Sequence, residues 1–289
     1  MCAQFFKKSP LGLGPGLRLR RALVGSCLLI ALLACQRRPQ PAGGPRSSAT
    51  DPSAPQQRPL RVAAAADLEP AFAALAVTFE ARHGRKVVFS FAGSTALSQQ
   101  IEHGAPFDVY AAASQRHVEA LVEKGRIEPA SLRPFARGAL VLWTRPASHH
   151  AASSGPALPM QIADLAQPQY RRIAVANPEH APYGLAAVQA LRSAGLYETV
   201  LPRLVFGENI RQAHQFVATG NADVAMDALS LAMASQTPYT TVPKALYSPL
   251  LQALGTVRGG DAVGAGAFVA LLLSDEGQQV LKRFGFDPP

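Results

Sequence analysis

The chain has 289 residues, of which 28 are lysine or arginine and 19 are aspartate or glutamate, giving a formal net charge of +9. Nine of the basic residues and one of the acidic residues precede Pro59, so the rest of the chain is nearly neutral, with a net charge of +1. That part of the sequence has no basic stripe with interleaved aromatic side chains, and we expect no nucleic-acid partner.

The first 34 residues have the pattern of an export signal. A basic region between Lys7 and Arg21 is followed by an apolar run over residues 22–34, which is shorter than the ~20 residues that a membrane-spanning helix needs. The run ends in the letters LLAC at residues 32–35, the pattern of a lipid-attachment site. We therefore predict that Cys35 is lipidated and holds the protein on the periplasmic or extracellular side of the cell membrane. The alternative is an ordinary cleaved signal with an incidental cysteine.

The cysteines and the following segment agree with this interpretation. The three cysteines are Cys2, Cys27 and Cys35, so removal of the signal would leave Cys35 alone, with no disulfide and no thiol nucleophile. Residues 35–58 are rich in Pro, Gly, Ser and Gln and show no apolar periodicity. Because such a segment buries too little apolar surface to offset its ordering entropy, we predict a disordered, lipidated tether.

From Pro59 onward, short apolar segments alternate with segments of helical periodicity, which predicts an α/β fold. The predicted strands cover residues 61–66, 86–91, 108–112, 139–143, 173–176, 204–207 and 223–226. The predicted helices cover residues 68–83, 96–103, 116–124, 185–194, 210–219 and 274–285. This alternation implies parallel sheets with helices on both faces, and such sheets bind ligands at the carboxyl ends of their strands.

Two strand-to-helix turns have the composition of an anion site. The first predicted strand ends in Ala65-Ala66-Asp67, and the second ends in Gly93-Ser94-Thr95. Small residues let the backbone approach a ligand, and the unpaired N–H groups at a helix start attract negative charge. Each turn alone is explained as well by an N-cap without a ligand. Two such turns on neighbouring strands favour a shared anion site.

Several segments resemble the molybdate-binding proteins of ABC transporters. The matching segments are AAAADL (63–68), FAGSTALSQQIEHGAPFDVYAAAS (91–114), IAVANPEHAPYG (173–184), ENIR (208–211), NAD (221–223) and FGF (284–286). GAPFD and PEHAP are distinctive of that group, whereas the terminal GF occurs in many solute-binding families. The resemblance extends from Pro59 to the C-terminus.

The resemblance implies a two-lobed, type II periplasmic-binding-protein-like fold, in which each lobe is a mainly parallel sheet flanked by helices. Two crossover strands would form the hinge, with residues 59–142 and 246–289 in lobe 1 and residues 143–245 in lobe 2. It also implies capture of molybdate, and of tungstate, by a monomer that delivers the anion to an ABC permease. The resemblance also implies that the protein is not an enzyme and needs no cofactor. Another tetrahedral oxyanion, sulfate or phosphate, is the alternative ligand.

Carried over residue by residue, the resemblance places the oxyanion contacts of the family on Asp67, Ser94, Tyr183, Ile210 and Ala228. Several members have Ser where this chain has Asp67, so we expect the backbone N–H of Asp67 to contribute while its side chain turns away or caps the helix. Some members have a Tyr where this chain has Ala228, and the hydroxyl of Tyr183 would replace the missing one. Ile210 would contribute its backbone N–H.

Other kinds of chemistry are less well supported. Arg211 is the nearest candidate for a positive clamp on the anion, but an ion-paired helix residue is the more common role. The seven histidines show no i, i+4 pair of metal ligands, and the chain has neither a Gly-x-Ser-x-Gly elbow nor a Walker loop. Asp223 and Asp227 could suggest an acid–base pair, although spacing alone does not make one. An enzyme or a scaffold lipoprotein therefore remains as an alternative class.

Overall fold

The computed structural model describes residues 58–145 and 156–289. The predicted signal peptide, Cys35 and the tether up to residue 57 lie outside the described residues. No helix in the described ranges is long and apolar enough to cross a membrane.

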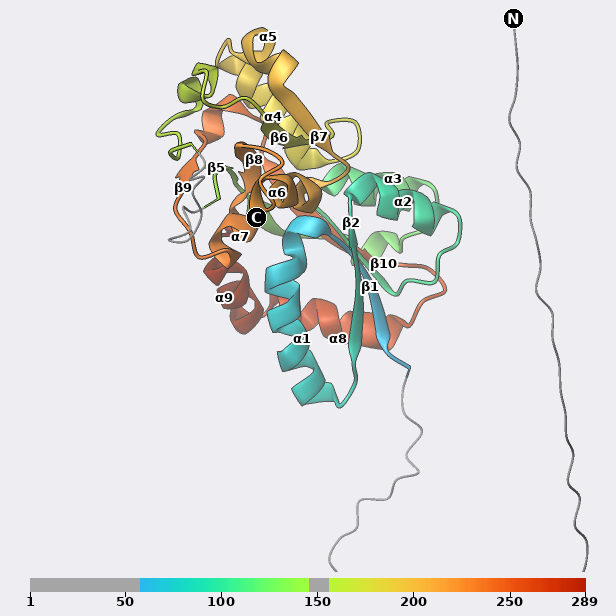
Figure 1. Cartoon of the computed structure of the whole chain (residues 1–289). Helices are drawn as coiled ribbons and strands as arrows, with labels where there is room; N and C mark the ends of the chain where they lie inside the picture. The colour runs from blue at the N-terminus through green and yellow to red at the C-terminus, as the bar shows by residue number, and fades with distance from the viewer. Residues whose placement is uncertain (1–57, 146–155) are drawn as a thin grey trace, which may run out of the picture. The chain divides into compact units, whose positions relative to one another are not determined.

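The first sheet has the strand order β2-β1-β3-β10-β4. Its strands are β1 (Leu60–Ala65), β2 (Val87–Ala92), β3 (Val109–Ala112), β4 (Arg133–Gly138) and β10 (Leu250–Thr256). The helices beside it are α1 (Glu69–His83), α2 (Ser94–Glu102), α3 (Gln115–Glu123), α8 (Ala262–Leu273) and α9 (Asp275–Arg283), and a short turn of 3₁₀ helix, η1 (Ala66–Leu68), links β1 to α1. Figure 1 shows α1 and α8 on one side of β1 and β2, and α2 and α3 on the other.

The second sheet has the strand order β7-β6-β8-β5-β9. Its strands are β5 (Leu140–Trp143), β6 (Ile173–Ala176), β7 (Leu204–Gly207), β8 (Val224–Ala228) and β9 (Tyr239–Thr241). The helices of this half are α4 (Pro182–Ser193), α5 (Tyr197–Val200), α6 (Ile210–Ala218) and α7 (Leu229–Ala234). The two sheets with their helices form the two lobes that the sequence predicts.

The sheets are mixed, but in each of them four of the five strands run in the same direction, as the prediction of mainly parallel sheets requires. β1 pairs in parallel with β2 and β3, whereas β10 runs antiparallel to β3 and β4. In the second sheet β6 pairs in parallel with β7 and β8, whereas β5 runs antiparallel to β8 and β9. The antiparallel pairings arise because β4, β5, β9 and β10 are the strands through which the chain passes between the lobes.

The chain changes sheets at Ala139, between β4 and β5, and returns between β9 and β10. Residues 140–142, which we expected in lobe 1, therefore pair in the second sheet. The predicted lobe boundary at residues 142 and 143 lies three residues after the point where sheet membership changes.

Alternating side chains along each strand build the core on both faces of the first sheet. Val62 and Ala64 on β1 pack with Phe72 of α1 and Phe268 of α8. Ala63, between them, packs on the opposite face with residues of α2 and α3. Gly84, which ends α1, has a left-handed φ of 60° and so provides the stop that the sequence predicts.

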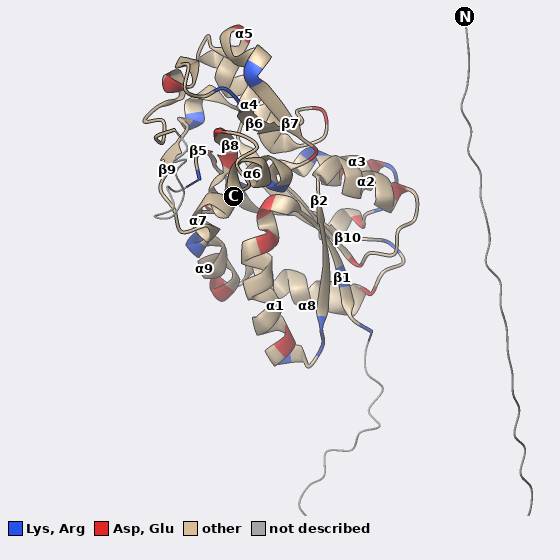
Figure 2. Ribbon diagram, viewed as in Figure 1, with Lys and Arg blue, Asp and Glu red and all other residues tan. Residues whose placement is uncertain are grey.

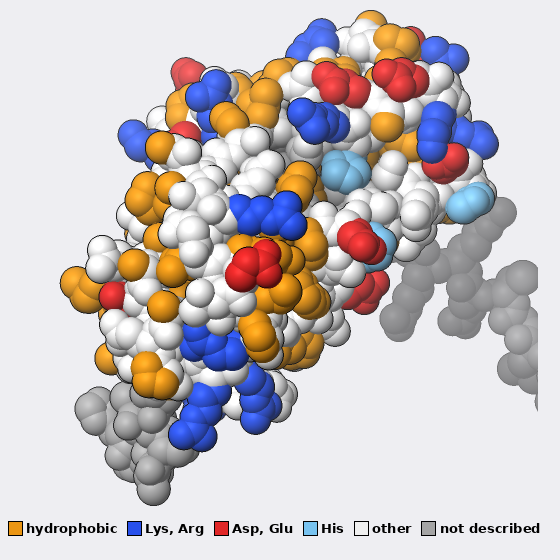
Figure 3. All heavy atoms as spheres, turned by 90° about the horizontal axis from the view of Figure 1, so that it is seen from above, with side chains coloured by type: hydrophobic (Ala, Val, Ile, Leu, Met, Phe, Trp, Pro, Cys, Tyr) orange, Lys and Arg blue, Asp and Glu red, His pale blue; other side chains and the backbone are white. Residues whose placement is uncertain are grey.

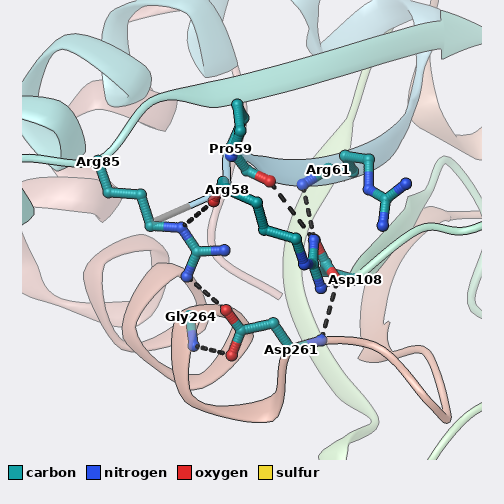
Figure 4. A network of polar contacts seen from close by, with 7 residues as sticks. All are labelled: Arg58, Pro59, Arg61, Arg85, Asp108, Asp261 and Gly264. Atoms are coloured by element: carbon teal, nitrogen blue, oxygen red, sulfur yellow. Dashed lines mark hydrogen bonds and ion pairs between the residues drawn. The ribbon is translucent and has the colours of Figure 1, made fainter. Parts of the chain in front are cut away.

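A polar network fixes the amino end of β1 (Figure 4). The Asp108 carboxylate accepts two bonds from the Arg58 guanidinium, at 2.7 and 2.8 Å, and two from the backbone N–H groups of Arg61 and Asp261. The Arg85 guanidinium bonds to the carboxylate of Asp261 and to the Arg58 carbonyl. Arg58, which we assigned to the tether, therefore contacts the folded part directly.

The charged side chains of the described residues are scattered over both lobes (Figure 2). On the face in Figure 3, basic side chains alternate with acidic and apolar ones and form no continuous basic strip.

Candidate functional site

A small cavity of about 10 Å³ lies where the two lobes meet, at the carboxyl ends of parallel strands. Its volume is close to the ~10–15 Å³ that one water molecule needs. It is lined by Ala65, Ala66, Asp67, Ala92, Gly93, Ser94, Ala113, Ala181, Pro182, Tyr183, Asn209 and Ile210. The cavity thus brings together four of the five predicted contact residues, from two turns of each lobe.

Helix starts dominate the cavity wall. Ser94 begins α2, Ile210 begins α6, and Tyr183 is the second residue of α4. The first N–H groups of a helix have no partner within the helix and carry a partial positive charge. No lysine or arginine is among the lining residues, so these dipoles and a few side chains supply the polar character of the site.

The lobes contact each other around the cavity. The Thr95 N–H donates to the carbonyl of His180 at 3.4 Å, and the Ser230 hydroxyl donates to the carbonyl of Asp67 at 2.7 Å. Arg211 of α6 forms an ion pair of 2.9 Å with Glu69 of α1. This contact confirms the expectation that Arg211 is an ion-paired helix residue, and it does not line the cavity.

Ser94 is the hydroxyl best placed for an anion. Its side chain is buried, with 1% exposed, and its Oγ accepts a bond from the Ala113 N–H at 3.1 Å. The hydroxyl proton has no acceptor among the described residues, so Ser94 can donate it into the cavity. The neighbouring Thr95 hydroxyl pairs instead with Nε2 of His117 at 3.1 Å, and burial lowers the pKa of that histidine.

Asp67 lies in the cavity wall with 1% of its surface exposed. Its side chain makes no helix-capping bond, which corrects the capping alternative. Instead its Oδ2 accepts a bond from Nε2 of Gln252 on β10, and its Oδ1 has no partner. Burial raises the pKa of Asp67 from 3.8 to about 6, although Gln252 and Tyr183 lower it in part.

The buried Asp67 carboxyl weakens the fold at neutral pH. Because its folded pKa is raised, the carboxyl stabilises the fold below about pH 4, and this contribution is lost as the pH rises through about 6. A rise from 3.8 to about 6 corresponds to about 3 kcal/mol.

Tyr183 reaches the same buried cluster from the other lobe. It is 2% exposed, and its hydroxyl, which has no partner of normal geometry, lies against Gly138 at the end of β4. Burial and the nearby Asp67 raise the pKa of Tyr183 well above 10, so the side chain remains a neutral hydrogen-bond donor. The hydroxyl thus lies near Asp67 and Gly138, on the hinge side of the cavity.

The remaining predicted contacts differ in their placement. Ile210 lines the cavity as the first residue of α6, and the side chain of Asn209 before it caps that helix by accepting from Gln212 at 3.1 Å. Ala228 is fully buried but is not among the lining residues, and its N–H bonds to Oδ1 of Asp227 at 2.8 Å.

Sequence reasoning missed Gln252 and Ala113. Ala113 directly follows the third predicted strand. Because ligands bind at the carboxyl ends of parallel strands, the argument that selected the ends of the first two strands would also have selected Ala113. Gln252 carries no such signal, since a single polar residue in an apolar segment has many explanations. Within the described ranges, no group of three or more His, Cys, Asp or Glu side chains could hold a metal ion.

Comparisons with known proteins agree with the geometry. The family model described as bacterial extracellular solute-binding protein matches residues 60–287. The molybdate-binding protein ModA of Azotobacter vinelandii is 36% identical over 238 residues, covering 81% of this chain and 91% of that protein. ModA of Escherichia coli K12 is 30% identical, covering 78% and 88%. A putative ABC transporter substrate-binding lipoprotein of Bacillus subtilis, YvgL, is 27% identical, covering 78% and 85%.

Solved structures show the same architecture. The periplasmic molybdate-binding protein of Azotobacter vinelandii superposes with a TM-score of 0.73 at 29% identity, covering 80% of this chain and 99% of that one. The sulfate-binding protein SubI of Mycobacterium tuberculosis has a TM-score of 0.65 at 18% identity, covering 80% and 87%, and supports the fold alone. The two-lobed type II fold is thereby confirmed.

Proposed function

The chain belongs to the bacterial extracellular solute-binding proteins, and from this premise we propose that it captures molybdate, and also tungstate, outside the cytoplasmic membrane. It then delivers the anion to the membrane subunits of an ABC permease, acting as a monomer that binds and does not catalyse. Its relatives of 30–36% identity are named molybdate-binding proteins, which supports this substrate class.

The observation that carries the proposal is the cavity between the lobes. Three helix starts and the Ser94 hydroxyl are hydrogen-bond donors, and no cationic side chain lines the wall. Donors without a salt bridge suit an anion that must be released again to a permease.

Sulfate and phosphate are the alternative ligands on this fold. Hydrogen phosphate carries a proton and needs an acceptor, which the unpartnered Oδ1 of Asp67 could supply. Molybdate, tungstate and sulfate carry no proton near neutral pH, so the donors of the cavity match them better.

Titration of the purified chain with the four anions tests the proposal. An anion at 100 times its dissociation constant should raise the free energy of unfolding by ~2.7 kcal/mol, which differential scanning calorimetry measures. We expect molybdate and tungstate to stabilise the protein at concentrations at which sulfate and phosphate do not. Stabilisation by sulfate or phosphate at the lower concentration would assign the protein to the alternative ligand.

Attachment to the membrane through a lipid on Cys35 completes the proposed role. The LLAC motif and the lipoprotein name of the relative YvgL support it. A tethered capture protein stays near its permease, so each anion is bound close to the point of transport.

A further inference from the structure

Asp67 is an acidic residue in the wall of the cavity to which we assign an anion. An ionised carboxylate in the wall would repel a dianion bound there, and because Asp67 is only 1% exposed, solvent would screen this repulsion poorly. The surroundings of Asp67 indicate how this chain avoids that repulsion.

The polar cluster around Asp67 is short of one proton. Besides the bond from Gln252 to Oδ2, three buried atoms have no partner, namely Oδ1 of Asp67, Oε1 of Gln252 and the hydroxyl of Tyr183. Oδ1 and Oε1 are acceptors when Asp67 is ionised, whereas Tyr183 is the one donor among the three. A proton on Asp67 would provide the second donor.

Among the described residues, no cationic side chain forms an ion pair with Asp67. β10 contributes the neutral Gln252 and α4 the neutral Tyr183, and α7 contributes the Ser230 hydroxyl, which is bonded to the Asp67 carbonyl. The ionisable groups farther out are already paired or are themselves neutral or acidic. These are the exposed pair of Glu69 on α1 and Arg211 on α6, the pair of Asp227 on β8 and His214 on α6, and Tyr247 before β10.

We propose that Asp67 takes up one proton from solvent when the oxyanion binds, so that the site captures the anion together with a proton. The neutral carboxyl then donates a hydrogen bond, either to the anion or within the Gln252–Tyr183 cluster, and the net charge brought into the cavity falls from −2 to −1. This inference rests on the proposed function and adds a proton to its binding step.

The proposal has a defined pH window. The pKa of Asp67 is raised by burial to about 6, and a bound dianion raises it further. Above about pH 6 the free protein therefore holds an ionised Asp67, and binding must add the proton. The dissociation constant should then rise about tenfold for each pH unit between about pH 6 and about pH 8, because one proton is linked to each anion.

Isothermal titration calorimetry of the chain with molybdate measures this proton directly. Titrations at about pH 7.5 in two buffers with different ionisation enthalpies give the number of protons taken up per anion. We expect about one proton for the wild type and about none for Asp67→Asn, whose pH profile should be flat. Glu123→Gln is the matched control, since it makes the same acid-to-amide change at an exposed residue of α3 outside the cavity wall and should keep the proton uptake.

The outcomes separate this inference from the proposed function. Tight molybdate binding by the wild type without proton uptake would overturn the inference and leave the function intact. Unchanged uptake in Asp67→Asn would assign the proton to another group and would also overturn it. A wild type that binds none of the four anions would instead reject the function. If Asp67→Asn does not fold, Asp67→Ser replaces it, and the wild-type proton count decides on its own.

Discussion

Individual residues at the helix starts determine what the cavity can bind. Ser94 combines three roles, because it begins α2, accepts a bond from the Ala113 N–H and keeps its own proton free to donate. Its carbonyl also accepts a bond of 2.7 Å from the buried Tyr110 hydroxyl. This arrangement orients the Ser94 side chain before any ligand arrives, so no rotamer freedom has to be lost on binding.

Substitution of Ser94 by alanine should weaken anion binding by about 1–3 kcal/mol, because a donor to a charged group is lost. The unfolding free energy of the ligand-free protein should also fall by about 1 kcal/mol, since the Ala113 N–H loses its acceptor. Calorimetric titration and denaturant unfolding measure the two effects. Ser98→Ala, a half-buried serine on the same helix outside the cavity wall, is the control and should bind normally. Unchanged affinity in folded Ser94→Ala would remove Ser94 from the contacts.

At the scale of elements, the crossover strands connect the hinge with the site. β4 ends at Gly138, and the Tyr183 hydroxyl of α4 lies directly against this glycine. The same region of the chain holds Gln252 of β10, the partner of Asp67. A helix of one lobe therefore inserts its hydroxyl between strands that lead into the other lobe. Through the contact between Tyr183 and Gly138, the position of α4 depends on the relative position of the two lobes.

Gly138→Ala tests this coupling, because a methyl group at Gly138 would overlap the Tyr183 hydroxyl. We expect the free energy of unfolding to fall by about 1–3 kcal/mol, the usual range for overpacking, and molybdate affinity to fall with it. Tyr183→Phe in the same chain removes the overlapping oxygen and should restore part of the stability. Gly266→Ala in α8, where an added methyl meets no atom within 4 Å, is the control. Equal stability of Gly138→Ala and the wild type would contradict the role given to this contact.

At the scale of the whole molecule, the folded part and the proposed lipid attachment lie in separate parts of the sequence. The described residues contain the cavity to which we assign the anion, whereas the predicted signal, Cys35 and tether precede them. The link between the two is Arg58, whose guanidinium is held by Asp108 at the amino end of β1 (Figure 4). The cavity lies at the carboxyl ends of the strands, whereas Arg58, the last residue of the predicted tether, lies at the amino end of β1.

Cys35→Ala should release the protein from membranes and leave its molybdate affinity unchanged, because the predicted lipid is attached far from the site in sequence. Membrane fractionation and calorimetric titration of the two forms measure this. Cys27→Ala removes a cysteine of the predicted signal and should stay with the membrane, which makes it the matched control. Continued membrane association of Cys35→Ala would reject lipid attachment at this residue.

The sequence by itself predicted seven of the ten described strands and missed β4, β9 and β10, whereas the two-lobed class came from the resemblance to the molybdate-binding proteins. The predicted strands 173–176 and 204–207 have the observed bounds of β6 and β7, and Gly84 ends α1 as expected. These features follow from local periodicity and from turn residues, which act over a few neighbours. The same local rules located Ser94 and Ile210 at helix starts. α8 was missed because its sequence, AVGAGAFVALLL, is apolar on every face and so lacks a helical pattern.

The tertiary structure alone decided what surrounds the site. Gln252 meets Asp67 across 185 positions of sequence, and Tyr183 meets Gly138 because α4 packs across the crossover strands. The mixed pairing of both sheets has the same origin, since β10 and β5 enter antiparallel from the opposite lobe. No local pattern carries this information, because burial and pairing between distant segments depend on how the lobes assemble. Burial, which raises the pKa of Asp67, therefore arises when the whole protein folds and cannot be read from any single segment of the sequence.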